Sequence, residues 1–414
     1  MNNDVLIIGG GVIGVSTAYF LAQKGIPVTL IEKGDVAAGS SYGNAGLVCP
    51  CHSVPLPAPG ALTQGIKWLF NPESPFYVKP RLDMDLLAWL RRFQSFANRK
   101  AFDRAVPLLR DLQRASLDLY QMIIERENLA CHFEKSGGLM LFHTAAGFEH
   151  GQKETAVLQK HGLQMKVLSG DEARQMEPLA RPEIVGGIHY EEDAHLTPDL
   201  FVKGLAAAAQ AQGANLLTQT ELLEFAREGD RITAVATTRG TFQPGQVVLA
   251  AGVWSSLLAR QLGLKLPMQP AKGYSITVKR PSPSPQTHLH LGEAKVVVTP
   301  MGPHLRFAGT LELAGYDLAI NQRRVQAILR AADDYLTGME EKEIVEIWRG
   351  LRPCSPDGLP YIGRPAAVSN LIIAAGHAML GLSMGPITGQ LAAELAAGER
   401  PSLDLAAFGV ERFG

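Results

Sequence analysis

DVLIIGGGVIG, residues 4–14, is an apolar strand that runs directly into a glycine-rich turn and the start of a helix. Gly9 allows the tight turn, Gly11 lets the backbone approach a pyrophosphate closely, and Gly14 lets the helix pack against the strand. The unpaired N–H groups and the positive dipole end of the helix then face two negative phosphates. The stretch therefore predicts a dinucleotide site.

The flanking segments support this prediction. A second apolar strand over residues 26–31 ends at Glu32, where a carboxylate accepts hydrogen bonds from a ribose 2′-hydroxyl and repels a 2′-phosphate. The helix predicted over 12–24 carries apolar residues at helical spacing. A structural βαβ unit with an empty site is the alternative, and it gives no reason for Glu32. This segment by itself leaves NAD and FAD equally open.

The composition is that of an ordered globular protein without a marked charge. The chain has 414 residues, 46% hydrophobic and 19% charged, with a formal net charge of -1. The length supports two or three domains, and the charge offers no basic face for nucleic acid.

The sequence also lacks a long apolar segment. The longest apolar runs, 247–253 and 371–375, are far below the roughly 20 residues that span a bilayer. The first strand begins so near Met1 that no signal peptide fits before it. We therefore expect a cytoplasmic protein, with a peripheral position on the inner face of the cell membrane as the alternative.

The four cysteines, Cys49, Cys51, Cys131 and Cys354, predict no metal site. The pair Cys49-Pro50-Cys51 lacks the two-residue spacer of zinc and redox motifs, and no second pair completes a tetrahedral set. The small number fits a reducing compartment. We expect buried or incidental thiols.

Residues 34–60 are rich in Gly, Ser and Pro and predict a long loop. Beside a nucleotide strand, this loop is a candidate for wrapping the cofactor. Ser40, Ser41, Asn44 and the amides around Gly46 are then donors to phosphate and ring oxygens. A solvated connector is the alternative.

The middle of the chain alternates helical and extended patterns. Apolar spacing predicts helices over 62–70, 84–98 and 106–128. The basic, aromatic patch at 66–70 (IKWLF) fits either buried packing or a contact with a membrane surface. Strands over 139–142 and 187–191 precede a helix over 199–212, with Thr197 as its N-cap and Pro198 at its first position. A parallel strand is expected from residue 213.

The second half of the chain returns to the opening pattern. Antiparallel strands over 230–249 lead into the apolar run at 247–253, whose end is expected beside the cofactor. Strands over 267–312, interrupted by the proline-rich turn at 281–285, precede helices predicted over 321–336 and 340–350. A strand over 370–375, the loop GHAMLG (376–381) and a helix over 385–397 follow. The nucleotide domain is therefore predicted to be assembled from both ends of the chain.

The two ends together resemble the flavoprotein amine oxidoreductases of the D-amino-acid oxidase type, over essentially the whole chain. The motifs are GGGVIG with Glu32, SSYGNAG (40–46), VVLAAGVWS (247–255), GLRPCSPDGLPYIG (350–363) and AAGHAMLGLSMGPITG (374–389). The resemblance implies an α/β fold with a Rossmann-like, glutathione-reductase-like FAD-binding domain and a second, α+β substrate domain. It assigns 1–60, 150–262 and 340–414 to the first domain and 61–149 and 263–339 to the second.

The resemblance also implies non-covalently bound FAD and a set of site residues. Backbone amides around residues 376–381 and the last helix are expected at the pyrimidine end of the flavin, where negative charge develops on reduction. The expected cofactor-binding residues are Gly9, Gly11, Val12, Ile13, Gly14, Glu32, Lys33, Ser40, Ser41, Asn44, Ala45, Gly46, Leu47, Leu222, Ala251, Gly252, Trp254, Gly376, His377, Met379, Leu380, Gly381, Leu382 and Ser383.

Four residues are candidates for the substrate site. Arg352, expected in a turn between a helix and a strand, suits a substrate carboxylate because a guanidinium binds it in a bidentate manner. Tyr274 offers a phenolic donor, and His52 and His377 titrate near neutral pH. A surface arginine, a core tyrosine and structural histidines are the alternatives.

The implied reaction is the oxidation of a D-amino acid to an imino acid and then a keto acid, with hydride transfer to the flavin and electrons passed to a quinone or another acceptor. The strands around Val298 and Arg306 are similar to those of D-proline or D-hydroxyproline dehydrogenases. The arginine that relatives often carry near Pro300 or Met301 is absent, which leaves Arg352 as the main carboxylate partner. A sarcosine- or glycine-type oxidase that uses oxygen, and a flavin-binding subunit of a larger complex, are the alternatives.

Overall fold

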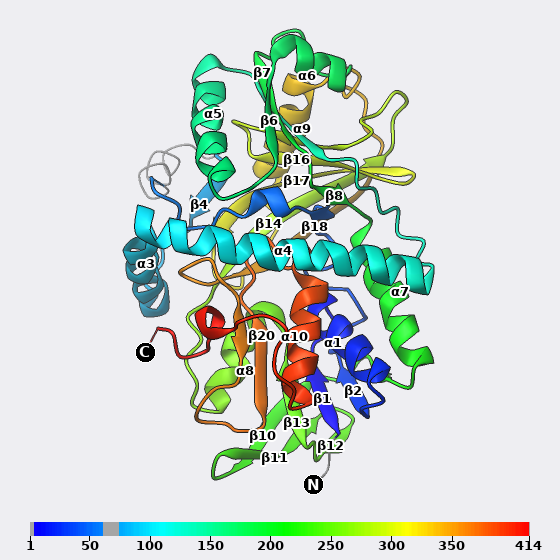
Figure 1. The fold of residues 1–414 in the computed structure, drawn as a ribbon, viewed down its shortest axis with the longest axis vertical. Helices are drawn as coiled ribbons and strands as arrows, with labels where there is room; N and C mark the ends of the chain where they lie inside the picture. Colours follow the sequence, from blue (N-terminus) through cyan, green and yellow to red (C-terminus); the bar gives the residue numbers. More distant parts are fainter. Residues whose placement is uncertain (1–3, 61–73, 414) are drawn as a thin grey trace.

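Two β-sheets organise the computed structural model, which describes residues 4–60 and 74–413 (Figure 1). The first sheet has six strands in the order β19-β20-β13-β1-β2-β9. Its strands pair in parallel except β19, which is antiparallel to β20. The bounds are β1 Val5–Ile8, β2 Val28–Ile31, β9 Asn215–Leu217, β13 Gln246–Leu249, β19 Tyr361–Gly363 and β20 Leu371–Ala375. The two ends of the chain therefore share one sheet, as predicted.

Both faces of the first sheet are covered, which explains its continuously apolar strands. Val5 and Ile7 of β1 pack on the side of the helices, whereas Leu6 and Ile8 belong to the core on the opposite side. The helices are α1 Val12–Gln23, α7 Pro198–Ala211 and α10 Gly385–Ala396. The other side carries the antiparallel strands β10 Leu222–Glu228, β11 Arg231–Thr237 and β12 Gly240–Phe242, and helix α8 Ser255–Gln261.

The second sheet has nine strands in the order β18-β14-β17-β16-β15-β5-β7-β6, with β4 beside β17. Helix α9 packs on its central strands, and α5 and α6 pack on β5, β6 and β7. The bounds are β4 Phe76–Val78, β5 Gly138–Phe142, β6 Met165–Ser169, β7 Gly186–Tyr190, β14 Gln269–Lys279, β15 His288–Leu291, β16 Val296–Met301, β17 His304–Leu313, β18 Ile344–Cys354, α5 Ala145–Gln159, α6 Gly170–Met176 and α9 Gln322–Tyr335.

The remaining elements connect the two sheets. Helix α4, Arg99–Glu127, runs across the middle of the molecule in Figure 1 and packs against α10. Helix α3, Met84–Phe96, precedes it. The short strands β3 Leu47–Val48 and β8 Ala194–His195 pair antiparallel. Three 3-10 turns complete the description, η1 Pro50–His52, η2 Gly252–Trp254 and η3 Ala406–Phe408.

The helix predicted over 340–350 is wrong, because most of this segment belongs to β18. That strand pairs with β14 from Ile344 to Cys354. Ile344, Val345, Ile347 and Trp348 are β-branched or aromatic residues, which favour an extended backbone. The alternation of charged and apolar residues in this segment also fits a helix, but pairing with the long strand β14 determines that it is extended.

The predicted domain boundaries at 150 and 340 also differ from the sheet topology. Strands β6 and β7, within the segment 150–262, and β18, within 340–414, belong to the nine-stranded sheet. Short strands separated by helices carry no local signal for the sheet that they join.

The predicted helix over 62–70 and its basic, aromatic patch lie outside the described residues. Among the described helices, none is both long and apolar enough to cross a membrane.

Candidate active site

A cavity of about 1370 Å³ is lined by residues of both sheets. It extends from the glycine turn after β1 to the residues Gly350 and Arg352 of β18. Its volume exceeds the roughly 300–1,000 Å³ of a typical small-molecule pocket. The cavity therefore has room for a dinucleotide and a small substrate together.

The glycine turn and Glu32 form one end of this cavity. Gly9 has a φ of +116°, and a Cβ there would lie 2.5 Å from the carbonyl oxygen of Ala250. The Glu32 carboxylate accepts hydrogen bonds from the amides of Gly10 (2.7 Å) and Gly34 (2.8 Å). These bonds fix the carboxylate at the turn, where a ribose is expected. The Nζ atom of Lys33 lies 4.2 Å from the centre of the Trp254 ring at the same end.

The loop 40–46 lies against the start of α1 beside the glycine turn, but part of its hydrogen-bonding capacity is used within the protein. Ser41 Oγ accepts the first N–H of α1, from Val12, at 2.9 Å. The Ser40 hydroxyl donates to the carbonyl oxygen of Leu351 at 2.8 Å, and the Gly46 amide donates to Asn44 Oδ1 at 2.9 Å. Ser40 and the Gly46 amide were predicted to donate to the cofactor, and both donors are already occupied.

Arg306 holds this loop in place, a role that the sequence analysis missed. Its Nη1 atom donates to the carbonyl oxygens of Tyr42 and Asn44, both at 2.9 Å, and its Nε atom donates to Thr277 Oγ1 at 3.1 Å. The side chain is buried. The only signal in the sequence is one arginine within the largely apolar strand β17, since a buried cation requires several acceptors.

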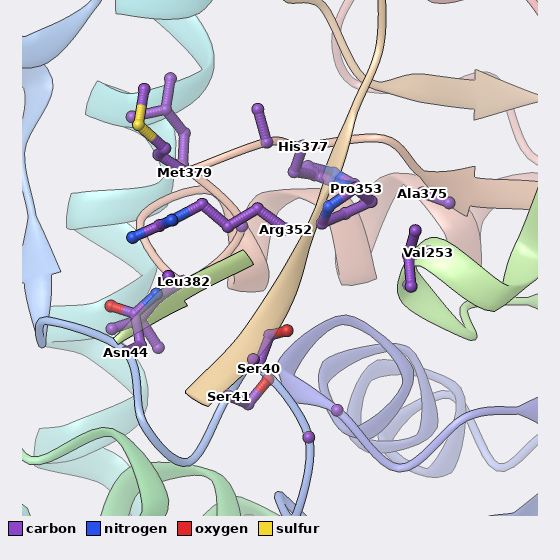
Figure 2. Close-up of a pocket in the computed structure, with 18 of the residues that line it drawn as sticks. Ser40, Ser41, Asn44, Val253, Arg352, Pro353, Ala375, His377, Met379 and Leu382 are labelled. Carbon is purple, nitrogen blue, oxygen red and sulfur yellow. The ribbon is translucent and has the colours of Figure 1, made fainter. Parts of the chain in front are cut away.

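Arg352 reaches into the cavity from β18, not from a turn (Figure 2). Protein surrounds the side chain, which keeps only the solvent access that the cavity provides, and this burial lowers the pKa of its guanidinium. One N–H of Nη1 donates to the carbonyl oxygen of Thr310 at 2.8 Å. Within residues 4–60 and 74–413, no carboxylate forms an ion pair with it.

Gly273 of the neighbouring strand makes room for this guanidinium. A Cβ at Gly273 would collide with Nη1 and Nη2 of Arg352. Arg352 therefore presents an uncompensated positive charge and its remaining N–H donors, which lie in one plane, to the cavity. This arrangement fits the carboxylate of a small substrate.

His377 lines the cavity near the C-terminal end of β20, within the loop 376–381. Its Nε2 atom lies 3.0 Å from Thr388 Oγ1 of α10. Burial lowers the pKa of the imidazole to about 3, so the ring is neutral at physiological pH. Its Nδ1 atom is buried and has no hydrogen-bond partner among the described residues. Figure 2 shows His377 on the same loop as Met379 and Leu382.

Tyr274 touches the cavity, but its hydroxyl faces a buried ionic cluster. The hydroxyl donates to Glu312 Oε1 at 3.1 Å and accepts the amide of Asn321 at 3.3 Å. Glu312 also pairs with Lys272 (3.3 Å) and Arg324 (2.8 Å). The phenol is therefore already engaged, which favours the alternative of a core tyrosine over a donor to the substrate.

His52 forms part of the cavity wall at η1. Its ring stacks on His290 with centroids 4.2 Å apart, and Nε2 lies 3.5 Å from Asp193 Oδ2. Burial is the main cause that lowers the pKa of His52 to about 4. A neutral imidazole thus faces the cavity near neutral pH.

The cavity brings together most of the predicted site residues. All four substrate-site candidates line it, and so do the predicted cofactor residues except Gly14, Gly46 and Gly376. These three glycines serve close packing, because a Cβ would meet Gly9, Leu196 and Tyr361 respectively. Trp348 and Thr310 also line the cavity, and the sequence analysis did not identify them.

Comparison with known proteins identifies the class. The model of the FAD dependent oxidoreductase family matches residues 4–395, and the chain belongs to this family. The family cofactor is FAD. The tight glycine turn, the fixed Glu32 carboxylate and the size of the cavity fit this dinucleotide.

Individual relatives agree with this assignment. The chain is 32% identical to the D-amino acid dehydrogenase of Granulibacter bethesdensis, over 99% of each chain. Among solved structures, the glycine oxidase from Geobacillus kaustophilus is 26% identical and has a TM-score of 0.80, covering 99% of this chain and 98% of the other. The L-proline dehydrogenase from P.horikoshii has a TM-score of 0.75 at 23% identity, covering 99% and 97%, and shares the fold.

Proposed function

We propose that the protein is an FAD-dependent dehydrogenase of D-amino acids, with D-proline and D-hydroxyproline as the narrower candidates. The observation that carries the proposal is Arg352, a half-buried guanidinium that faces the cavity without a carboxylate partner in the described part of the chain. The D-amino acid dehydrogenases that are about 32% identical over the full length support the substrate class.

Arg352 binds and orients the substrate in this proposal. A bidentate contact with the carboxylate fixes the α-carbon relative to the cavity wall. Thr310 holds one N–H of the guanidinium, so the fork does not rotate freely. Bound FAD would supply the acceptor for the hydride of the carbon that bears the amine.

The two histidines of the cavity wall add no positive charge to that of Arg352. His377 and His52 are neutral near physiological pH because burial lowers their pKa values to about 3 and about 4. A substrate amine that arrives neutral loses hydride directly, so the site requires no general base. Water hydrolyses a linear imine to the keto acid, whereas a cyclic substrate gives a cyclic imine.

The proposed electron acceptor is a quinone or another acceptor other than oxygen. A quinone dissolves in the bilayer, so this proposal includes peripheral contact with the inner face of the membrane. At the start of α3, the side chains of Leu82, Met84 and Leu87 are exposed to solvent and available for such a contact. Flotation of the holoenzyme with liposomes tests it.

The deciding experiment is anaerobic mixing of the holoenzyme with a panel of amines. Loss of flavin absorbance with D-proline, D-hydroxyproline or D-alanine, but not with their L-enantiomers, is the expected result. Reduction by glycine or sarcosine alone favours the second candidate, an amine oxidase, which the likeness to a glycine oxidase supports. A flavoprotein that no member of the panel reduces fits a binding subunit of a larger complex.

Two further measurements complete the assignment. Turnover with an artificial dye and little peroxide is expected for a dehydrogenase, and stoichiometric peroxide for an oxidase. Release of the yellow cofactor into the supernatant after acid precipitation is expected for non-covalent FAD. Retention of the colour in the protein pellet contradicts that part of the proposal.

A further inference from the structure

Three ionisable side chains meet in the interior where η1, β8 and β15 come together. Cys49 directly precedes η1, Asp193 directly precedes β8, and His288 begins β15. All three are buried, with exposed fractions of 1%, 0% and 0%. The proposed oxidation uses none of them.

The fold, not the local sequence, brings these three residues together. Strand β3 ends at Val48, opposite Ala194 of β8, so the pairing places Cys49 and Asp193 side by side. His288 approaches from the nine-stranded sheet, next to Gly138 of β5. A Cβ at Gly138 would collide with the His288 ring, so this position needs a glycine to make room for the imidazole.

The donor atoms are spaced almost as in a tetrahedral metal site. One atom from each residue lies within 4.8 Å of the other two. Cys49 Sγ is 3.8 Å from His288 Nε2, which is 4.0 Å from Asp193 Oδ2. Around zinc, bond lengths of about 2.3 Å to sulfur and about 2.0–2.1 Å to nitrogen or oxygen separate such donors by roughly 3.3–3.6 Å. To close the site, the distance from His288 Nε2 to Asp193 Oδ2 would have to shorten by about 0.7 Å and that from His288 Nε2 to Cys49 Sγ by about 0.2 Å.

Asp193 is oriented as a ligand and lacks a strong partner for one oxygen. Its Oδ1 atom accepts the amide of Cys51 at 2.9 Å, which fixes the carboxylate in the way that outer hydrogen bonds orient metal ligands. Its Oδ2 atom is buried and accepts no hydrogen bond of good geometry within the described residues, where the thiols of Cys49 and Cys51 are its weak donors. Its ion pairs there involve histidines only, His52 and His288. A buried carboxylate oxygen without a strong donor is costly.

We propose that Cys49, Asp193 and His288 bind a thiophilic divalent cation of the Zn²⁺ class. A thiolate, a carboxylate and an imidazole together suit zinc, and the two anionic ligands neutralise its charge in the protein interior. Three protein ligands leave a fourth position for water or for His52, whose Nε2 atom is 3.5 Å from Asp193 Oδ2. The ion would tie η1 to the nine-stranded sheet directly behind the cavity wall, because Cys49 and His52 line the cavity.

The test measures metal binding by the purified holoenzyme and is independent of the substrate. Elemental analysis after expression with added zinc is expected to give about one ion per chain, removable by a strong chelator. Reconstitution with Co²⁺ is expected to produce ligand-field bands on the long-wavelength side of the flavin absorption, together with a thiolate charge-transfer band.

Substitutions assign the ligands. C49S, D193N and H288Q are each expected to lose the ion, while C51S keeps it, because the Cys51 thiol donates to the carbonyl oxygen of Gln164 and lies outside the ligand set. FAD content and circular dichroism report whether each variant is folded. The proposal fails if folded wild-type protein binds neither Zn²⁺ nor Co²⁺, if the Co²⁺ spectrum shows no thiolate band, or if the folded ligand variants keep the ion.

Discussion

Replacement of Arg352 by methionine removes the cation that we assign to the substrate carboxylate while keeping a side chain of similar length. The guanidinium is enclosed by protein except where it faces the cavity, and Thr310 occupies only one of its five N–H donors. In the variant, the carboxylate enters the cavity without a partner, which costs about 2–4 kcal/mol. Because each 1.4 kcal/mol is a factor of ten, kcat/KM should fall about 30- to 700-fold.

The assay is dye-coupled turnover together with anaerobic flavin reduction over a range of substrate concentrations. R352K should fall between wild type and R352M, because lysine keeps the charge and loses the bidentate geometry. R349M is the matched control, since Arg349 lies on the same strand, is absent from the cavity lining and binds the carbonyl oxygen of Leu318. An R352M protein that contains full FAD and has unchanged kcat/KM would refute the role of Arg352.

Three further predictions concern the ionisable residues Glu32, Glu312 and His377. E32Q removes the anionic acceptor of the Gly10 and Gly34 amides and should weaken FAD binding about 10- to 100-fold in a fluorescence titration. An E32Q variant that binds FAD as tightly as wild type contradicts this role of Glu32. E312Q removes the negative charge that pairs with the buried Lys272 and Arg324 and should lower the free energy of unfolding by about 3–5 kcal/mol. The control E340Q breaks an exposed pair with Arg181 and should lower the free energy of unfolding by only about 0–1 kcal/mol. The pKa of His377 is about 3 when folded and 6.5 ordinarily, so the unfolded chain binds more protons between these values and stability falls on acidification. The contribution of His377 to the stability lost from pH 8 to pH 4.5 should be about 3 kcal/mol. In denaturant unfolding, H377Q should therefore lose about this much less than wild type over the same range, whereas the exposed-site control H150Q should lose as much as wild type.

The first sheet could be predicted from the sequence because its signals are local. Most parallel strands are apolar runs with a glycine near at least one end, and the last helix, α10, packs against α1 directly after β1. The second sheet could be predicted only in part, because its strand order depends on contacts between distant segments. Nothing near Met165 indicates that β6 pairs with β7 and thereby joins the nine-stranded sheet.

In the site, too, the features with local sequence signals could be predicted and those that depend on distant segments could not. Glu32 and the glycine turn follow from spacing within one βαβ unit, and the structure places them at one end of the cavity. The support from Arg306 and the meeting of Cys49, Asp193 and His288 depend on strands that are far apart in sequence. Spacing rules for metal ligands consider short motifs, so they miss donors that a sheet brings together from three segments.

The conformation of the segment 344–354 decides which of its residues face the cavity. In a strand, residues two apart share a face, and Trp348, Gly350 and Arg352 all line the cavity. The intervening Leu351 is buried away from it and offers its carbonyl oxygen to Ser40. In a helix, Trp348 and Arg352 would share a face while Gly350 would lie on the opposite one, and the Arg352 guanidinium would not lie over Gly273. The extended backbone of β18 therefore gives Arg352 access to the cavity and places the carbonyl oxygen of Leu351 against Ser40 of the loop 40–46.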